Sequence, residues 1–594
     1  MRTPSAYCLY NPDRPKTSRK IAVFLTSALM LGAAALLSRA YASVLFQFFG
    51  PDSVIRDKLT TAELLEETAA LPIHNYYFLP ISQSTTPPHP LSGTIHFSEA
   101  SMKTTHPSSD WKGGGQNIFP GFSISFVSHQ EYLIPLQRGI IVSGEKNNSY
   151  WNIIVSPGRI WREDTDGTFS RAAFPFVLTD NAIGQARNGI ATFVYDHRSI
   201  SCAAIQVTQE TAPIDAYFHG NFSALIPARY IPGSHPESLE VIDSFDREIK
   251  ARIPVKPWAE LRNPVWLKHI FNGGLSDDKV SAAALYMDGA IYLQGIQTRT
   301  GPYPFPLEMR HGVFSVTKSL AMGLAMFYAA ERYGDEIFNE RICDYVPKLA
   351  DHPGWHGVTF EHALGMATGT SGSEEGMDIA PYILARTADE KIAAIRDLPD
   401  ADPAPGARMN YASTNFFALS YALNRFFKSM EGPQGDYWNL VKRDVLTPMG
   451  IGHMALTRTV ESNGQLGIPI MGWGSYPTFQ EAVKIARLLY DEGEFHGRQL
   501  LSRKRVREAL SRTERRGWET GRSADGPQYY LHSLWQQPVL TAQGRINVPS
   551  MRGHGGNLVG ILPSGLIVLR FGDENYTDLR YMIEVAEYLR PSQP

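Results

Sequence analysis

The stretch that decides the fold spans residues 314–334 and runs Phe-Ser-Val-Thr-Lys-Ser-Leu-Ala-Met-Gly-Leu-Ala-Met-Phe-Tyr-Ala-Ala-Glu-Arg-Tyr-Gly. Apolar side chains recur in it at three- and four-residue spacing, and alanines, which are strong helix formers, lie between them. It ends at Arg332-Tyr-Gly334, and a basic residue followed by glycine is typical of a helix C-terminus. The stretch therefore predicts a helix with Ser315 and Lys318 in its first turn.

Ser315 and Lys318 form an S-x-x-K motif. Residues three apart lie on one face of a helix, so this hydroxyl and this amine can touch, and the positive field of the helix N-terminus favours a developing alkoxide. The same spacing starts at Ser109, Ser143 and Ser276, so at least three of the four occurrences are accidental. Only Ser315 opens a helical pattern. The alternative is an ordinary surface serine and lysine at a helix start.

A second hydroxyl group comes from Tyr411-Ala-Ser413. A Pro405-Gly406 turn leads toward it, and a helical pattern over residues 416–427 follows. A phenol placed beside a nucleophile can pass a proton during catalysis. The alternative is that Tyr411 only packs against the helix that follows it.

The third segment, His554-Gly-Gly-Asn557, opens an apolar strand, and Pro563-Ser-Gly565 then turns into a second strand. Glycine in a strand often marks close approach of another backbone or of a ligand. A backbone N–H aimed from such a strand can stabilise an oxyanion. The alternative is a plain hairpin bend.

A nucleophilic hydroxyl, an amine base, a second hydroxyl and an oxyanion donor together fit acyl transfer through a serine ester. In this order, the segments make the chain from about residue 280 onward resemble the serine hydrolases related to penicillin-binding proteins and class C β-lactamases. That group also holds esterases, D-amino-acid peptidases and nylon-oligomer hydrolases. Residues 358–369 and 480–510 resemble two further segments of the family.

The resemblance implies a catalytic role for three residues. Ser315 is the nucleophile that forms an acyl-enzyme, Lys318 is its base, and Tyr411 relays the proton. The implied substrate is a small-molecule ester, amide or peptide, and neither a cofactor nor a metal is implied. The substrate-binding and oxyanion residues implied are Ser413, His554, Gly555, Gly556 and Asn557, with the N–H groups of Ser315 and Asn557 as the oxyanion hole.

His554 departs from the family, which has lysine at this position of its K-T-G strand. Histidine is a weaker and pH-dependent cation, so esterase, amidase or D-peptidase activity is favoured over β-lactamase or transpeptidase activity. A competing interpretation makes His554 the base of a Ser-His pair and Lys318 a bystander. We expect His554 to face the substrate instead.

The first residues carry targeting signals. Basic residues precede an apolar run over residues 21–37, and Ala40-Tyr-Ala42 offers a small-residue cleavage site. Residues 1–42 are therefore predicted to be a signal peptide or a membrane anchor. If Ala42 is not cleaved, residues 21–49 would associate the protein with the membrane. The expected location is periplasmic or exported, with anchoring to the inner membrane as the alternative.

Residues 52–245 contain short β-like runs that are punctuated by glycine, proline, asparagine and aspartate. They predict an all-β N-terminal domain, which we expect to be a sandwich. Residues 246–594 are expected to form the hydrolase domain, an antiparallel sheet flanked by helices with a helical subdomain that holds Tyr411. The fold class expected for the whole chain is α/β in the α+β sense.

Within the hydrolase domain, residues 280–286 and 290–294 predict a hairpin. We expect it to pair with the strands over residues 558–571.

The composition excludes several classes of function. The 594 residues carry a formal net charge of −3 and are 43% hydrophobic, which is typical of a globular protein without a nucleic-acid-binding surface. The three cysteines provide no disulfide framework. His352 and His356 are four apart, but Pro353 and Gly354 break the helix that a metal site would need.

The alternative to a serine hydrolase is a catalytically idle scaffold or sensor at the cell envelope.

Overall fold

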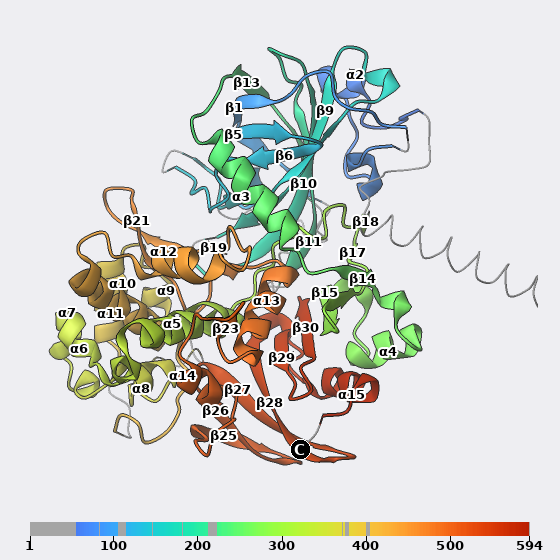
Figure 1. Ribbon diagram of the computed structural model, residues 1–594. Helices are drawn as coiled ribbons and strands as arrows, with labels where there is room; N and C mark the ends of the chain where they lie inside the picture. The colour runs from blue at the N-terminus through green and yellow to red at the C-terminus, as the bar shows by residue number, and fades with distance from the viewer. Residues whose placement is uncertain are drawn as a thin grey trace, which may run out of the picture. The chain divides into compact units, whose positions relative to one another are not determined.

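The computed structural model describes residues 55–592, except for 82, 105–114, 145–146, 181, 212–221, 371, 373, 375–378 and 400–403. The predicted signal peptide or anchor lies outside the described residues. Within the described ranges, no helix has the length and apolar character needed to cross a membrane. The chain from Phe49 onward forms one unit, which holds two large sheets (Figure 1).

The first sheet contains eleven strands among the described residues, and every neighbouring pair in it is antiparallel. The order is β13-β1-β5-β6-β8-β9-β10-β11-β12-β3, with β7 beside β9. Its strands are β1 (Ser92–Phe97), β3 (Lys103–Thr104), β5 (Phe122–His129), β6 (Tyr132–Pro135), β7 (Asn152–Val155), β8 (Gly158–Trp161), β9 (Ser170–Thr179), β10 (Ala186–Tyr195), β11 (Ala203–Thr211), β12 (Phe222–Ile226) and β13 (Ala228–Pro232).

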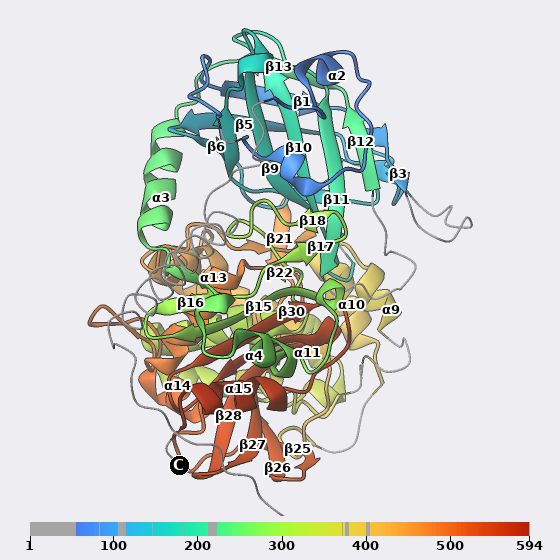
Figure 2. The same ribbon diagram turned by 90° about the vertical axis from the view of Figure 1, so that its right-hand side faces the viewer.

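The sheet-rich character of this region is confirmed, although helix α2 (Thr61–Leu65) precedes the strands. The strands form one curled sheet and not the expected sandwich of two sheets. Phe97 on β1 and Phe174 on β9 lie four strands apart in the sheet order, yet their ring centroids are 6.0 Å apart. The curl lets one face enclose an aromatic core, so the long strands β9 and β10 are buried along their whole length. Helix α3 (Ser238–Lys250) follows the last strand and packs on β6 through Phe245 (Figure 2).

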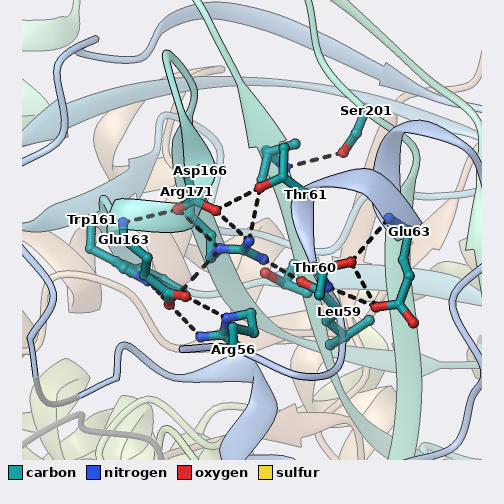
Figure 3. Close-up of polar contacts among 12 residues, drawn as sticks. Arg56, Leu59, Thr60, Thr61, Glu63, Trp161, Glu163, Asp166, Arg171 and Ser201 are labelled. Atoms are coloured by element: carbon teal, nitrogen blue, oxygen red, sulfur yellow. Dashed lines mark hydrogen bonds and ion pairs between the residues drawn. The ribbon is translucent and has the colours of Figure 1, made fainter. Parts of the chain in front are cut away.

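A buried charge network attaches the segment before β1 to this sheet (Figure 3). Arg56 Nε donates to Glu163 Oε2 at 2.7 Å, and Arg171 Nη2 donates to Asp166 Oδ1 at 2.6 Å. Arg171 also donates to the Leu59 carbonyl at 2.8 Å. All four charged side chains are buried. Because each cation has a carboxylate in direct contact, the network is held without an unpaired charge.

The second sheet contains nine described strands in the order β14-β16-β15-β30-β29-β28-β27-β26-β25. All neighbours are antiparallel except β14 and β16. Both predicted hairpins are confirmed, and β15 pairs with β30 as expected. The strands are β14 (Val255–Pro257), β15 (Val280–Met287), β16 (Ala290–Leu293), β25 (Trp518–Ser523), β26 (Gly526–Leu531), β27 (Leu534–Thr541), β28 (Gly544–Gly553), β29 (Asn557–Ile561) and β30 (Ile567–Gly572).

Helices cover this sheet, which confirms the mixed fold class. Helices α4 (Pro264–Phe271) and α15 (Arg580–Leu589) share an apolar core with β15, β29 and β30, and α13 (Phe479–Tyr490) contacts the same three strands. A separate group of helices surrounds α11 (Ser413–Glu431), whose neighbours include α6 (Ile342–Tyr345), α8 (Phe360–Leu364) and α10 (Ala388–Arg396).

Candidate active site

Ser315 lies at the start of the predicted helix, but the first turns of that helix differ from the expectation. A π-helical segment, η6 (Lys318–Gly323), comes first and continues into the α-helix α5 (Leu324–Tyr333). The helix ends at Gly334, where φ is 95°, as the glycine predicted. Short π-helical segments are frequent at functional sites. Phe314 has φ of 44°, a strained conformation for a side chain of this size, immediately before Ser315.

Lys318 is the centre of the site. Its Nζ lies 2.7 Å from Ser315 Oγ, 2.6 Å from Ser413 Oγ and 2.8 Å from the Gly472 carbonyl oxygen. These three contacts use all three donors of an ammonium group. Burial lowers the pKa of Lys318 to about 8, because the charged form loses its hydration. A lysine with this pKa is partly neutral near pH 8 and can accept the proton of Ser315.

Tyr411 lies two residues before α11 and shares a hydrogen bond with Ser315. Burial raises the pKa of Tyr411 well above its usual value, so the phenol keeps its proton. Its ring centroid is 4.8 Å from Lys318 Nζ and 6.0 Å from the ring of Trp535, on which it stacks. Tyr411 is therefore placed to donate a proton and not to act as a phenolate base.

Ser413 connects Lys318 to an acidic residue that the sequence analysis missed. The Ser413 hydroxyl contacts the carboxylate of Glu374, whose Oε1 lies 3.9 Å from Lys318 Nζ. This carboxylate opposes the effect of burial by raising the pKa of Lys318. Glu374 follows the segment over residues 358–369 that resembles the family, but no spacing rule identified it.

The sequence analysis also missed Gly472. Its backbone lies so close to Ser413 that this position requires glycine. A Cβ at this position would lie 2.8 Å from Ser413 Cβ, so a larger residue would push α11 away. The Gly472 carbonyl could not then accept from Lys318 at the same place. The position lies outside every motif that the sequence analysis identified.

The His554 side chain is exposed and meets the ring of Phe314, with centroids 5.6 Å apart in an edge-on arrangement. Nearby protein atoms partly desolvate the imidazole and lower its pKa, while Glu374 opposes that change. His554 is therefore mainly neutral at neutral pH. It provides a hydrogen-bonding group next to Ser315 in place of a permanent cation.

The turn after His554 uses both glycines and Asn557. Gly555 and Gly556 have φ of 76° and 75°, a backbone conformation that favours glycine. Asn557 is fully buried, and its side chain donates to the His554 carbonyl at 2.6 Å and accepts from Gly572 N at 3.3 Å. The Asn557 side chain therefore fixes the turn. The oxyanion role of its backbone N–H stays a prediction.

A neighbouring glycine, Gly553, brings β28 against the backbone at Ser315. A Cβ at Gly553 would lie 2.2 Å from the Val313 carbonyl and 3.2 Å from Ser315 N. Glycine is therefore required for this approach. Gly553 belongs to the glycine-rich entry to the strand for which the sequence predicted a close approach, and Gly556 in the same entry makes a second one, since a Cβ there would lie 2.5 Å from the Glu574 carbonyl.

The structure thus brings Ser315, Lys318, Tyr411 and Ser413 into direct contact and places the turn over residues 554–557 beside them. Over the described part of the chain, no three metal-ligating side chains gather into a group that could hold an ion. A hydroxyl, a partly neutral amine and a protonated phenol in contact are groups that could supply a nucleophile and transfer its proton.

Residues 279–564 match the family model described as Beta-lactamase, which confirms the resemblance that the motifs indicated for this part of the chain. Similar solved structures include a penicillin-binding protein homologue from Pyrococcus abyssi, with 17% identity and a TM-score of 0.43 over 56% of this chain and 78% of that one. A D-stereospecific amidohydrolase from Streptomyces sp. has 15% identity and a TM-score of 0.39 over 54% of this chain and 97% of the other.

A family VIII carboxylesterase has 16% identity and a TM-score of 0.40, and the similarity covers 58% of this chain and 97% of the esterase. A comparison with curated proteins gave no match.

Proposed function

We propose that this protein is a serine hydrolase that cleaves an ester or amide bond through an acyl-enzyme on Ser315. The observation that carries the proposal is the 2.7 Å contact between Ser315 Oγ and Lys318 Nζ, together with the lowering of the Lys318 pKa to about 8. An activated serine needs a base within hydrogen-bond reach that is unprotonated for part of the time.

The reaction has two halves. Ser315 Oγ attacks the acyl carbon, and its proton passes to Lys318 Nζ. The bond to the leaving alcohol or amine then breaks, and Tyr411 delivers a proton to the departing group, which Lys318 replenishes. In the second half, water attacks the Ser315 ester, gives its proton to Lys318, and releases the carboxylic acid with restoration of the Ser315 hydroxyl.

Lys318 is favoured over His554 as the base by position. Lys318 Nζ contacts Ser315 Oγ directly, whereas the His554 ring meets Phe314. The exposed His554 side chain is suited to contact substrate. Ser413 Oγ accepts a hydrogen bond from Lys318 Nζ at 2.6 Å and so helps to hold the amine beside Ser315.

The charges of the site favour a neutral or amine-bearing substrate. Glu374 places a carboxylate beside Lys318 and Ser413, and its side chain is 38% exposed. A substrate carboxylate near this group would be repelled. We therefore propose small esters, amides or peptides that do not present a carboxylate at this position.

Active-site labelling tests the proposal. The full-length protein would be treated with a fluorophosphonate, digested, and examined by mass spectrometry, with Ser315→Ala as the matched control. We expect one adduct on the peptide that holds Ser315 and none in the control. Labelling only of peptides that contain Ser109, Ser143 or Ser276 would exclude the assignment.

We also propose that the catalytic part, residues 246–594, acts outside the cytoplasm, on the strength of the signal-like residues 1–42. Fractionation and N-terminal sequencing test this. We expect a mature chain that begins after Ala42, or an intact chain in the membrane fraction. An intact chain in the soluble cytoplasmic fraction would contradict it.

A further inference from the structure

The connection between β9 and β10 in the first sheet lies against two segments that hold Lys318. We call Thr179 and residues 182–188 the β9–β10 end. The first of the two segments, residues 310–317, leads directly into Lys318. The second, residues 472–476, includes the Gly472 carbonyl that accepts from Lys318 Nζ at 2.8 Å.

The β9–β10 end contacts the first segment through backbone and side chain. Asn188 is fully buried on β10, and its Nδ2 donates to the Arg310 carbonyl at 2.6 Å. A Cβ at Gly312 would lie 2.9 Å from the Gly184 carbonyl and 3.1 Å from Ala186 Cβ. The two backbones are therefore in van der Waals contact only three residues before Ser315.

The second segment is held in the same way. The Thr179 hydroxyl is hydrogen-bonded to the Tyr476 hydroxyl, and both residues are buried. Tyr476 also joins Val177 and Ala186 in a small apolar core. A Cβ at Gly184 would lie 3.2 Å from Trp473 Cδ1, so the indole next to Gly472 lies against this connection.

Polar contacts also link the two segments to each other. Arg310 Nη1 donates to the Tyr476 carbonyl at 2.8 Å, and the Arg310 guanidinium forms a two-fold contact with Glu481 at 3.1 and 3.2 Å. The hydroxyls of Thr317 and Ser475 are 2.7 Å apart. The first sheet, residues 310–317 and residues 472–476 thus form a closed set of contacts around Lys318.

Asp180, which follows Thr179, forms hydrogen bonds with the backbone of the β9–β10 end. The Asp180 carboxylate accepts from the backbone N–H groups of Ala182, Ile183 and Gln185 at 2.8, 2.6 and 3.0 Å. A connection whose backbone donors are satisfied in this way is pre-organised, and it can transmit the position of the sheet to its neighbours.

We propose that the first sheet is a positioning element of the catalytic site, in which Thr179 and Asn188 hold the segments that fix Lys318. This inference rests on the proposed function, because it assigns the contacts to the base of that reaction. Neither residue contacts Ser315 or Lys318, so the effect passes through Tyr476 and Arg310. Loosening these segments would admit water to Lys318 Nζ and return its pKa toward the usual value.

Three variants of the full-length protein, Tyr476→Phe, Thr179→Val and a control, test the proposal. Tyr476→Phe removes the contact with Thr179. The matched control, Tyr303→Phe, removes another buried hydroxyl, which donates to the Gly189 carbonyl of the same sheet at 3.0 Å but lies outside both segments. The readouts are kcat and KM for a chromogenic ester across pH, the thermal midpoint, and hydrogen–deuterium exchange of residues 310–323.

We expect Tyr476→Phe to lower kcat about tenfold, since small misplacements of catalytic groups have large effects on rate. KM should be unchanged, and the alkaline rise of kcat should shift upward from about pH 8. Exchange of residues 310–323 should be faster. Tyr303→Phe should leave kcat, pH midpoint and exchange within error of the wild type. Thr179→Val should reproduce Tyr476→Phe.

The inference is overturned if Tyr476→Phe and Thr179→Val both keep the wild-type rate, pH midpoint and exchange. It is equally overturned if Tyr303→Phe shows the same losses, because the effect would then be one of general stability. The proposed function is judged separately by fluorophosphonate labelling of wild-type Ser315. If labelling fails while exchange still distinguishes the two tyrosine variants, the mechanical coupling stands and the hydrolase assignment does not.

Discussion

Two buried cations, Arg171 in the first sheet and Lys318 in η6, differ in the groups that surround them. Arg171 lies 2.6 Å from a carboxylate oxygen of Asp166. Lys318 has hydroxyls and a carbonyl around it, and the carboxylate of Glu374 lies 3.9 Å away. The carboxylate at hydrogen-bonding distance compensates the buried charge of Arg171, whereas burial lowers the pKa of Lys318, whose carboxylate neighbour is more distant.

A third cation shows that a lowered pKa alone does not define a site. Lys391 is buried, donates to the Tyr382 carbonyl at 2.7 Å, and has its pKa lowered to about 8 by burial. No serine hydroxyl is among the contacts that the structure gives its amine. The three buried cations therefore differ in the groups that their amine or guanidinium contacts, and the variants below test the difference between Lys318 and Arg171.

The largest effect is expected from Lys318→Met. The variant removes the base and replaces a buried amine with an apolar side chain of similar length. We expect the rate to fall by a factor of about 10² to 10⁴, which is typical for loss of a general base, with little loss of thermal stability. Steady-state kinetics and calorimetry measure the two. Near wild-type turnover in a folded variant would show that Lys318 is not the base.

Arg171→Met is expected to have the opposite pattern. It leaves the Asp166 carboxylate buried without its cation, which typically costs about 3–5 kcal/mol in the free energy of unfolding. Turnover per folded molecule at low temperature should stay unchanged. Denaturant titration measures the stability, with Arg545→Met on an exposed strand position as the control. A variant as stable as the wild type would remove the distinction between the two cations.

Glu374→Gln tests whether the carboxylate that lies 3.9 Å from Lys318 Nζ affects the pKa of the base. Glu374 raises the pKa of Lys318, so its removal should lower that pKa below about 8. Because the neutral amine is the proposed base, the alkaline rise of kcat should move to lower pH. The relative rate at pH 7 should therefore increase. A midpoint that stays in place or moves upward would mean that Glu374 does not act on the base.

His554→Ala is expected to have the smallest effect on acylation. The exposed His554 ring meets Phe314, the residue before Ser315, so its loss should change the preference among acyl groups by a few fold. A panel of small esters and amides measures this. Uniform collapse on every substrate, with Lys318→Met mild, would support a Ser-His pair and contradict our assignment.

The features that the sequence predicted well are local ones. Ser315 and Lys318 are three residues apart in one helix, and the hairpin over residues 280–294 has a turn signal between its strands. Local spacing and turn chemistry were enough to place them. The π-helical first turns of that helix were not foreseen, because the pattern of apolar residues alone does not distinguish them from α-helix.

The features that the sequence could not predict depend on contacts between distant segments. Glu374, Gly472 and Gly553 reach the site from three separate segments, which are the stretch after α8, the connection between β21 (Leu466–Pro469) and β22 (Ser475–Tyr476), and β28. No local spacing identified Glu374 or Gly472. The curl of the first sheet likewise follows from Phe97 meeting Phe174 across the core, which strand patterns do not encode. The positions of these residues and the curl of the sheet depend on tertiary packing between segments that are distant in the sequence.

The central claim is that buried Lys318 is the base for Ser315. The most direct measurement is the rate of fluorophosphonate acylation of Ser315 as a function of pH, with the adduct located by mass spectrometry. We predict modification at Ser315 alone, with a rate that rises with pH around a midpoint near 8, where Lys318 loses its proton. Modification of another residue, or a rise that is complete below pH 7, would contradict the account.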